Sequence, residues 1–435
     1  MDQKSKSLKL SYFDGIFAAS MTGLTQDYFV PFLLLLGGTV GHVGALSALP
    51  NLFAALAQLK SPDLTDWLQS RKGVISLFVM LQAVILLVLG VSALFIGKVS
   101  PAIFISMVVL FCSFGALANP AWGSLMSDLV PQNQRGEYFG WRNRNLGLMT
   151  IVATFLAGAI LHHMKGINAF HGFALLFLLA FFCRGISWYF INGMRDPPLE
   201  KKQEDRFTIF DFLLRLKESN FAKFVVFVAA MNFSVNLAAP YFTVLMLKEL
   251  KFSYLLYTTL NIFVTLTVLA TTCRWGKHAD KLGNLRVIRF TARLIAFTPV
   301  LWILNRNPGF LVFAQIFSGF AWAGFNLACT NFIYDAVTPA KRTRCIAYFN
   351  LLNGLALSAG GFLGGMIVSR LPALFGYKIL TLFLIASCLR IAVAFFMPKL
   401  LKEVRPTENV SSQQLFFSMV GIKPILGIGQ KTTRY

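Results

Sequence analysis

Acidic and amide side chains interrupt the long apolar segments of this sequence. Asp27 lies about 17 residues into the first of them, which corresponds to roughly 25 Å along a helix. Desolvation at such a depth disfavours the charged form of an unpaired carboxylate. A group that loads and releases a proton needs this property, so Asp27 is a candidate for proton coupling. The alternative is an ordinary Asp in a water-filled outer vestibule.

Several amides are also placed within apolar runs. Gln26 neighbours Asp27, and Asn119 and Asn326 lie in two later runs. Asn232 and Asn236 are four residues apart, which places both on one face of a helix. Polar groups inside a membrane are functional candidates, although Asn side chains can also simply join neighbouring helices.

A repeat of half the chain relates these positions. Each member of the first set lies 207 positions before its partner in the second. The two sets are Asn119, Asp128, Arg135, Asn143, Gly158 and Asn326, Asp335, Arg342, Asn350, Gly365. Many secondary transporters consist of two such halves made of hydrophobic helices. The repeat therefore predicts a membrane transport protein.

The composition agrees with a membrane protein. Hydrophobic residues make up 56% of the 435 residues and charged residues 13%, against about 25% charged in soluble domains. The net charge of +22 is spread between apolar runs rather than gathered in one patch, which argues against nucleic acid as a partner. The six cysteines form no CxxC pair. We expect no metal site and no cofactor.

Twelve runs are long and apolar enough to cross a bilayer. They cover residues 10–36, 40–59, 74–96, 101–128, 139–161, 171–194, 222–247, 253–273, 286–304, 309–335, 344–369 and 374–397. Basic residues are dense in every second connection, which predicts both termini inside. We expect a multi-pass protein of the cytoplasmic (inner) membrane. We expect an N-terminal bundle over 1–197, a cytoplasmic linker over 198–221, a C-terminal bundle over 222–398 and a cytoplasmic tail over 399–435.

Two connections contain a further signature. After the eighth run, Gly276, Asp280 and Gly283 are followed by the basic Arg286. After the second run, Asp66 and Arg71 keep the pattern, while Pro62 and Gln69 replace its two glycines. These loops resemble the Gly-x-x-x-Asp-x-x-Gly-basic signature of the major facilitator superfamily. Together with the repeat and the runs, the resemblance to a bacterial-type 12-helix permease covers residues 8–398.

The resemblance implies an all-α membrane fold of 12 transmembrane helices in two pseudo-symmetric six-helix bundles. It also implies that the loop residues latch the halves in the outward-facing state, where ordinary helix-end charges are the alternative. The implied latch residues are Asp66, Arg71, Asp128, Gly276, Asp280, Gly283, Arg286 and Asp335. Because helices 1, 4, 7 and 10 line the cavity of that fold, it implies a substrate pathway of Gln26, Asp27, Asn119, Asn232, Asn236 and Asn326.

Other charged residues receive simpler interpretations. We expect Asp14, like Asp128 and Asp335, to lie near a cytoplasmic helix end where water reaches. We interpret Arg184 and Arg390 as side chains that extend to the membrane surface or contact anionic lipid. Arg286, Arg289 and Arg293 share one face of the ninth run and receive the same interpretation.

The sequence therefore predicts an alternating-access secondary transporter for a small organic solute, polar and either neutral or cationic. No nucleotide-binding motif is present, so we expect a gradient, most simply of protons, to drive it. We expect a monomer in the lipid bilayer. The alternative is a transport-inactive relative that acts as a sensor or assembly subunit, which the changed N-terminal motif favours. An enzyme is not expected, because the spans contain no paired acid and base, nucleophile or metal group.

Overall fold

A computed structural model describes residues 3–95, 99–131, 135–198, 219–337 and 339–404. Every named element in these ranges is a helix, because a chain in lipid must satisfy its backbone hydrogen bonds within each segment. Most of the predicted linker (199–218), most of the predicted tail (405–435) and the side chains of Arg135 and Arg342 lie outside the described part.

Eleven helices of the described residues are long and apolar enough to span a membrane. The predicted first run is built differently, from α1 (Gln3–Thr25), a short 3-10 turn η1 (Gln26–Tyr28) and α2 (Phe29–Leu35). Each of the twelve predicted runs thus coincides with a helix or with a group of consecutive helices.

The remaining helices of the N-terminal half follow the predicted runs, with one addition. They are α3 (Val40–Gln58), α4 (Ser61–Leu68), α5 (Arg71–Phe95), α6 (Pro101–Leu129), α7 (Arg135–Met164) and α8 (Ala169–Asn192). The addition is α4, which forms within the connection that contains Asp66. Pro62 lies in its first turn, where proline is well tolerated because the missing N–H would have no partner.

The C-terminal half has the same all-helical character. Its elements are α10 (Asn220–Asn236), α11 (Ala239–Val244), the π-helical turn η4 (Leu245–Glu249), α12 (Tyr254–Leu282), α13 (Asn284–Leu304), α14 (Pro308–Ala336), α15 (Pro339–Ile367), the 3-10 turn η5 (Val368–Arg370), α16 (Lys378–Phe396) and the 3-10 turn η6 (Met397–Leu400).

By packing, the chain divides into two compact units. Unit 1 comprises residues 1–203, 236–262 and 354–382, and unit 2 comprises 204–235, 263–353 and 383–435. Unit 1 therefore contains segments of both sequence halves. The predicted domain boundaries describe the repeat rather than this packing, and they stay a prediction.

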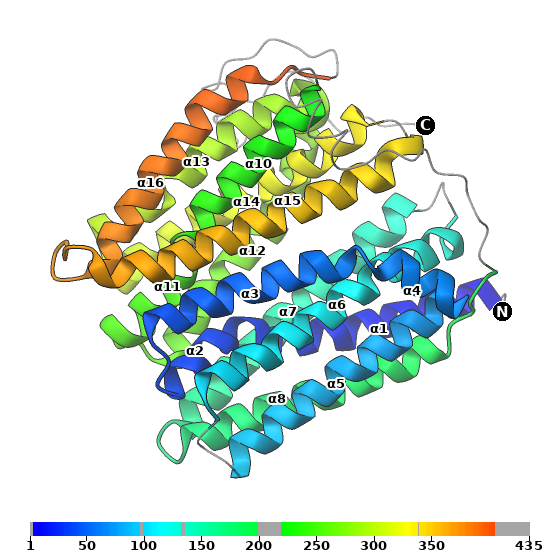
Figure 1. The fold of residues 1–435 in the computed structure, drawn as a ribbon, viewed down its shortest axis with the longest axis horizontal. Helices are drawn as coiled ribbons and strands as arrows, with labels where there is room; N and C mark the ends of the chain where they lie inside the picture. The colour runs from blue at the N-terminus through cyan, green and yellow to red at the C-terminus, as the bar shows by residue number, and fades with distance from the viewer. Residues whose placement is uncertain (1–2, 96–98, 132–134, 199–218, 338, 405–435) are drawn as a thin grey trace. The chain divides into compact units, whose positions relative to one another are not determined.

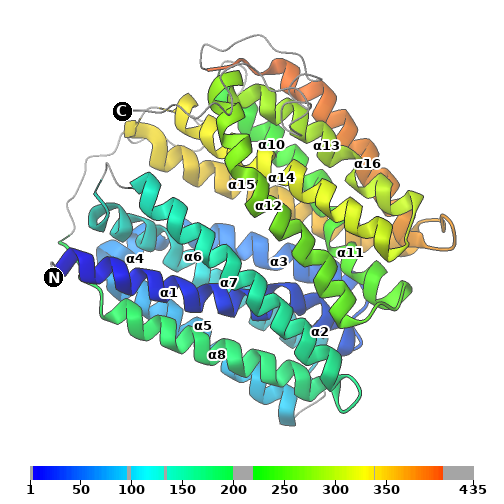
Figure 2. The same cartoon turned by 180° about the vertical axis from the view of Figure 1, so that it is seen from behind.

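In unit 1, α5 packs against α6 and α8, and α1 packs against α7 and α8. Figures 1 and 2 show these helices running alongside one another. Aromatic side chains fill one end of the bundle: the ring of Phe32 lies 5.1 Å from that of Phe104 and 5.0 Å from that of Phe173. This packing holds α2 in place beyond the interruption at η1.

In unit 2, α13 packs against α14. The Trp275 side chain is buried and donates from Nε1 to the Phe320 carbonyl oxygen at 2.9 Å. Gly324 leaves room for the indole, because a Cβ at this position would lie 2.7 Å from its ring atoms. Trp275 belongs to a hydrophobic cluster of buried residues in this unit.

Candidate substrate pathway and gate

The first membrane segment is interrupted at Asp27. Pro31 has no backbone N–H, so it cannot donate to the carbonyl oxygen of Asp27, four residues earlier. That oxygen instead accepts a hydrogen bond from the Tyr257 hydroxyl at 2.7 Å. The interruption therefore exposes a backbone acceptor beside the predicted coupling residue.

The seventh segment is interrupted at the corresponding place. Pro240 lies four residues after Asn236 and removes the donor for the Asn236 carbonyl, and the helix restarts as α11 at Ala239. The Asn236 side chain donates to Ser47 Oγ at 2.9 Å and to the Leu357 carbonyl oxygen at 2.6 Å. The prolines at 31 and 240 are the sequence signal that could have predicted both interruptions.

A buried hydrogen-bond chain joins the two sequence halves within unit 1. The Tyr28 hydroxyl donates to the Thr154 carbonyl oxygen at 2.6 Å and lies 2.8 Å from Thr258 Oγ1. Since the single Tyr28 proton goes to Thr154, the Thr258 hydroxyl donates to Tyr28. Tyr28 and Thr258 are both fully buried. We call the contact of Tyr28, Tyr257 and Thr258, with the backbone groups they bind, the gate contact.

Two glycines of the repeat lie where helices cross most closely in unit 1. A Cβ added to Gly158 of α7 would overlap the Thr258 side chain of α12. A Cβ added to Gly365 of α15 would lie 3.1 Å from Gly44 Cα of α3 and from the Tyr241 hydroxyl. The repeated glycines thus allow segments of the two halves to approach, which the sequence comparison alone did not explain.

The predicted pathway residues occupy two kinds of surroundings. Gln26, Asp27, Asn119 and Asn326 have exposed side chains. The structure shows no hydrogen bond or ion pair for the Asp27 carboxylate within the described part of the chain. Asn232 of α10 instead donates to Asn353 Oδ1 at 2.8 Å, as Asn236 does to Ser47. Whether these six residues line a substrate pathway stays a prediction.

The N-terminal latch residues are partly brought together. The buried Arg71 side chain contacts Asp128 at 2.6 Å and donates to the Pro197 carbonyl oxygen at 3.0 Å. Asp66 is exposed, and its backbone oxygen accepts from the Gln69 amide. Gln69 adopts a left-handed conformation with φ of 49°. It thus supplies the turn for which glycine is better suited.

The C-terminal latch residues surround the junction of α12 and α13. Gly276 and the exposed Asp280 lie in the last turns of α12, and Gly283 follows with φ of 90°. Asp335 accepts from the Asn284 side chain at 2.7 Å. Arg286 is half-buried in the first turn of α13. Asn284 was not among the predicted latch residues, and nothing in its spacing distinguishes it.

The expectation for Asp14 was wrong. Asp14 is buried at 4% exposure, accepts from Ser187 Oγ at 2.7 Å and lies 3.9 Å from Arg142. Arg184 is also buried and does not reach the membrane surface: it donates to Gln82 Oε1 at 2.6 and 3.1 Å and to Ser187 Oγ at 3.2 Å. These residues form a buried polar network across α1, α5, α7 and α8.

The interpretation of Arg390 was wrong as well. Its side chain is buried. Nη2 donates to the Val235 carbonyl oxygen at 3.1 Å, Nε to the Ser234 carbonyl oxygen at 3.4 Å and Nη1 to the Ile295 carbonyl oxygen at 3.5 Å. Val235 lies at the interruption after α10, where carbonyl groups and the helix dipole favour a cation. Arg390 therefore stabilises the end of α10.

Among the residues that the structure describes, no group of three or more His, Cys, Asp or Glu side chains converges on a possible metal position.

Several solved structures of other proteins have a similar fold. The nucleoside transporter NupG is 16% identical and superposes with a TM-score of 0.67 over 92% of this chain and 99% of its own. A POT family transporter in complex with 5-aminolevulinic acid is 12% identical, with a TM-score of 0.68 over 91% and 96%. The human organic anion transporter MFSD10 (TETRAN) is 15% identical, with a TM-score of 0.63 over 91% and 100%.

These similarities confirm the predicted fold class: the described residues form an all-α membrane fold like that of these transporters, with eleven helices that can span a membrane. No curated protein matches the chain. The sequence model of the Major Facilitator Superfamily matches residues 15–292 and 222–428, which together cover more than half of the chain. The chain is an integral, multi-pass membrane protein and belongs to the Major Facilitator Superfamily.

Proposed function

We propose that this protein is an alternating-access secondary transporter that moves a small polar organic solute and couples its movement to protons at Asp27. The paired interruptions at Asp27 and Asn236 are the observation that carries the proposal. Transporters commonly build their sites where membrane helices are discontinuous, because the freed backbone groups can bind solute or ion. Here both interruptions present polar side chains.

The gate contact supports alternating access. Tyr28 and Thr258 belong to different sequence halves and are joined by a single buried hydrogen bond between side chains. A contact of this size stabilises one state by only about 1 kcal/mol, so it can break during each transport cycle. The charge pattern predicts that this end of the protein faces outside.

Asp27 is the carboxylate whose surroundings suit proton exchange. Asp14 is held by Ser187 and by the nearby Arg142, so its negative charge is compensated within the bundle. The exposed Asp27 carboxylate has no such partner among the residues that the structure describes, and Gln26 beside it is also exposed. Water or a solute can therefore contact the Asp27 carboxylate, so this accessibility, rather than the desolvation expected from its depth, supports proton exchange there.

The experiment begins with purified full-length protein and a panel of nucleosides, 5-aminolevulinic acid, short peptides and organic anions. The panel represents the ligand classes named for structurally similar proteins. A compound that raises the melting temperature is then followed as a radiolabelled solute in proteoliposomes with an imposed pH gradient. We expect accumulation that collapses when a protonophore removes the gradient.

Asp27→Asn tests the coupling because it retains hydrogen bonding but cannot ionise. We expect it to abolish gradient-driven accumulation while exchange of labelled for unlabelled solute continues. Asp63→Asn is the matched control, since Asp63 forms an exposed ion pair with Lys60 at 3.3 Å. Accumulation by Asp27→Asn at the normal rate would exclude Asp27 as the coupling site.

A transport-inactive sensor is the competing function. It was favoured by the lost glycines of the N-terminal motif, but Gln69 adopts the left-handed turn and Arg71 contacts Asp128 despite that loss. The changed motif therefore gives no structural reason for inactivity. A panel compound that binds the protein without any flux would instead support the sensor.

A further inference from the structure

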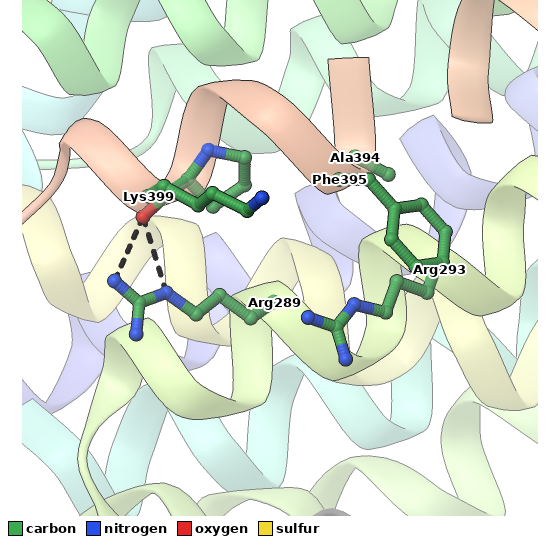
Figure 3. Close-up of a pocket in the computed structure, with 6 residues that line it drawn as sticks. Arg289, Arg293, Ala394, Phe395 and Lys399 are labelled. Atoms are coloured by element: carbon green, nitrogen blue, oxygen red, sulfur yellow. Dashed lines mark hydrogen bonds between the residues drawn. The ribbon is translucent and has the colours of Figure 1, made fainter. Parts of the chain in front are cut away.

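A cationic cavity lies in unit 2, beside the last turns of α16. Its volume is about 260 Å³, and α13 and α16 with η6 form its walls. Figure 3 shows the arginines of α13 opposite the end of α16. The lining residues are Arg289, Arg293, Ala394, Phe395, Pro398 and Lys399.

Arg289 fixes the shape of this cavity. Its Nε and Nη2 donate to the Pro398 carbonyl oxygen at 3.1 and 2.8 Å, and Nη2 donates to the Leu401 carbonyl oxygen at 3.0 Å. These bonds tie α13 to the chain that leaves α16. Arg289 is therefore a positioning residue that also contributes positive charge.

Among the described residues, no hydrogen bond is shown from the side chains of Arg293 and Lys399. The guanidinium of Arg293 lies 4.9 Å from the centre of the Phe395 ring, and its Nε is buried with no hydrogen-bond partner among the described residues. Lys399 is exposed, with its ammonium 5.3 Å from the centre of the Phe396 ring. A buried donor without a partner is unusual in a folded protein. Nε itself is shielded, so an acceptor in the cavity would contact the part of the Arg293 guanidinium that lines it.

Negative charge near the cavity is already engaged. Glu403 is the acid that interacts with Arg289, and its Oε2 accepts from the Leu285 backbone N–H at 2.7 Å, at the start of α13. The other charged neighbours of Arg289 are Arg286 and Arg293, which have the same sign. The cavity therefore has a net positive charge and suits an anion.

The surroundings indicate what kind of anion it is. Both helices are membrane-spanning by length and composition. Large apolar side chains are exposed around the cavity: Phe395 at 38%, Phe396 at 67% and Leu400 at 64%. A free phosphate ion would make no use of this apolar surface, whereas the acyl chains of a lipid would cover it.

We propose that the cavity of Arg289, Arg293 and Lys399 binds the phosphate of an anionic phospholipid, with the acyl chains against the exposed end of α16. Basic cavities between membrane helices are suited to such headgroups, and each basic residue near an anionic surface contributes roughly fivefold in affinity. The site is separate from the proposed solute pathway and does not depend on it.

The test measures binding of fluorescent phosphatidylglycerol to the purified full-length protein in neutral detergent, with phosphatidylcholine as the uncharged comparison. The double variant Arg293→Gln/Lys399→Gln removes two charges and leaves the bonds of Arg289 in place. We expect phosphatidylglycerol to bind it roughly 25-fold more weakly. Arg293→Lys/Lys399→Arg keeps both charges and should bind nearly as the unmodified protein does.

Arg306→Gln/Lys378→Gln is the matched control, because it removes one charge just after the far end of α13 and one at the far end of α16. We expect it to leave binding unchanged. Unchanged binding by the Arg293→Gln/Lys399→Gln variant, or equal loss in the control, would overturn the proposal. Displacement of the lipid by millimolar inorganic phosphate would show that the site takes the free ion, and would also overturn it.

Discussion

The Thr258 hydroxyl should set the balance between the closed and open gate. Thr258→Val removes that hydroxyl from a buried contact 2.8 Å from Tyr28 Oη and keeps nearly the same side-chain volume. Tyr28 still donates to the Thr154 carbonyl oxygen at 2.6 Å, so no buried donor loses its only acceptor. The loss is then one net hydrogen bond, about 1 kcal/mol, which raises the open-to-closed ratio about fivefold.

Gly158 provides a second measure of the same contact. Gly158→Ala places a methyl group against the Thr258 side chain, where no space is left. Overpacking of this kind costs about 1–3 kcal/mol, so the open-to-closed ratio should rise more than for Thr258→Val and in the same direction. If Thr258→Val and Gly158→Ala both raise the open-to-closed ratio, the gate contact is identified as what holds the closed state.

Spin labels at Lys165 and Lys248, both exposed, report the distance across this end of unit 1. The labels are introduced after the native cysteines are replaced, and pulsed electron resonance gives the share of long distances. Thr259→Val is the control, because the Thr259 hydroxyl donates to Leu255 O within its own helix at 2.8 Å. Equal distance distributions in Thr258→Val and the unmodified protein would refute the reasoning.

Three further predictions concern other parts of the molecule. Gln69→Gly should raise the free energy of unfolding by about 0.5 kcal/mol, and with it the melting temperature, because glycine adopts φ of 49° without strain and Gln does not. A melting temperature below that of the unmodified protein would contradict this prediction. Asp280→Ala should favour the inward-facing state if the latch operates, so spin-label distances across the predicted cytoplasmic face should widen, and unchanged distances would argue against the latch. Asp14→Ala should destabilise the protein by about 3–5 kcal/mol, since it leaves buried arginines without their acid; a chemical denaturation midpoint equal to that of Asp27→Asn would show that the network contributes nothing.

The helices were predictable because apolar length alone determines them. The predicted run 101–128 corresponds to Pro101–Leu129, and 309–335 corresponds to Pro308–Ala336. The connection after α3 was less predictable: the motif containing Asp66 was expected as a loop, yet its proline allows the short helix α4 to begin there. Apolar length thus located the spans but not the short helix in this connection.

The site was predictable only in part. Sequence position gives the depth of a residue along its helix, but not which neighbour it faces. Asp14 and Arg184 show the difference. Asp14 was expected where water reaches and Arg184 at the membrane surface or against anionic lipid, yet both face the interior of one bundle. Asp27 was selected by depth alone, whereas the proline that interrupts its helix was overlooked. The partner of the freed carbonyl, Tyr257, lies 230 residues away and follows only from tertiary structure.

The glycine crossings also affect how fast the gate can open. At the crossing of α3 and α15, Gly44 and Gly365 meet backbone to backbone, since a Cβ on Gly44 would lie 2.7 Å from Gly365 Cα. Surfaces without side chains do not interlock, so these helices can separate without any rotamer change. The activation barrier should then come mainly from the hydrogen bonds that join the two halves, those of Tyr28, Tyr257 and Asn236. The glycines would contribute speed, while the hydroxyl groups set the populations of the two states.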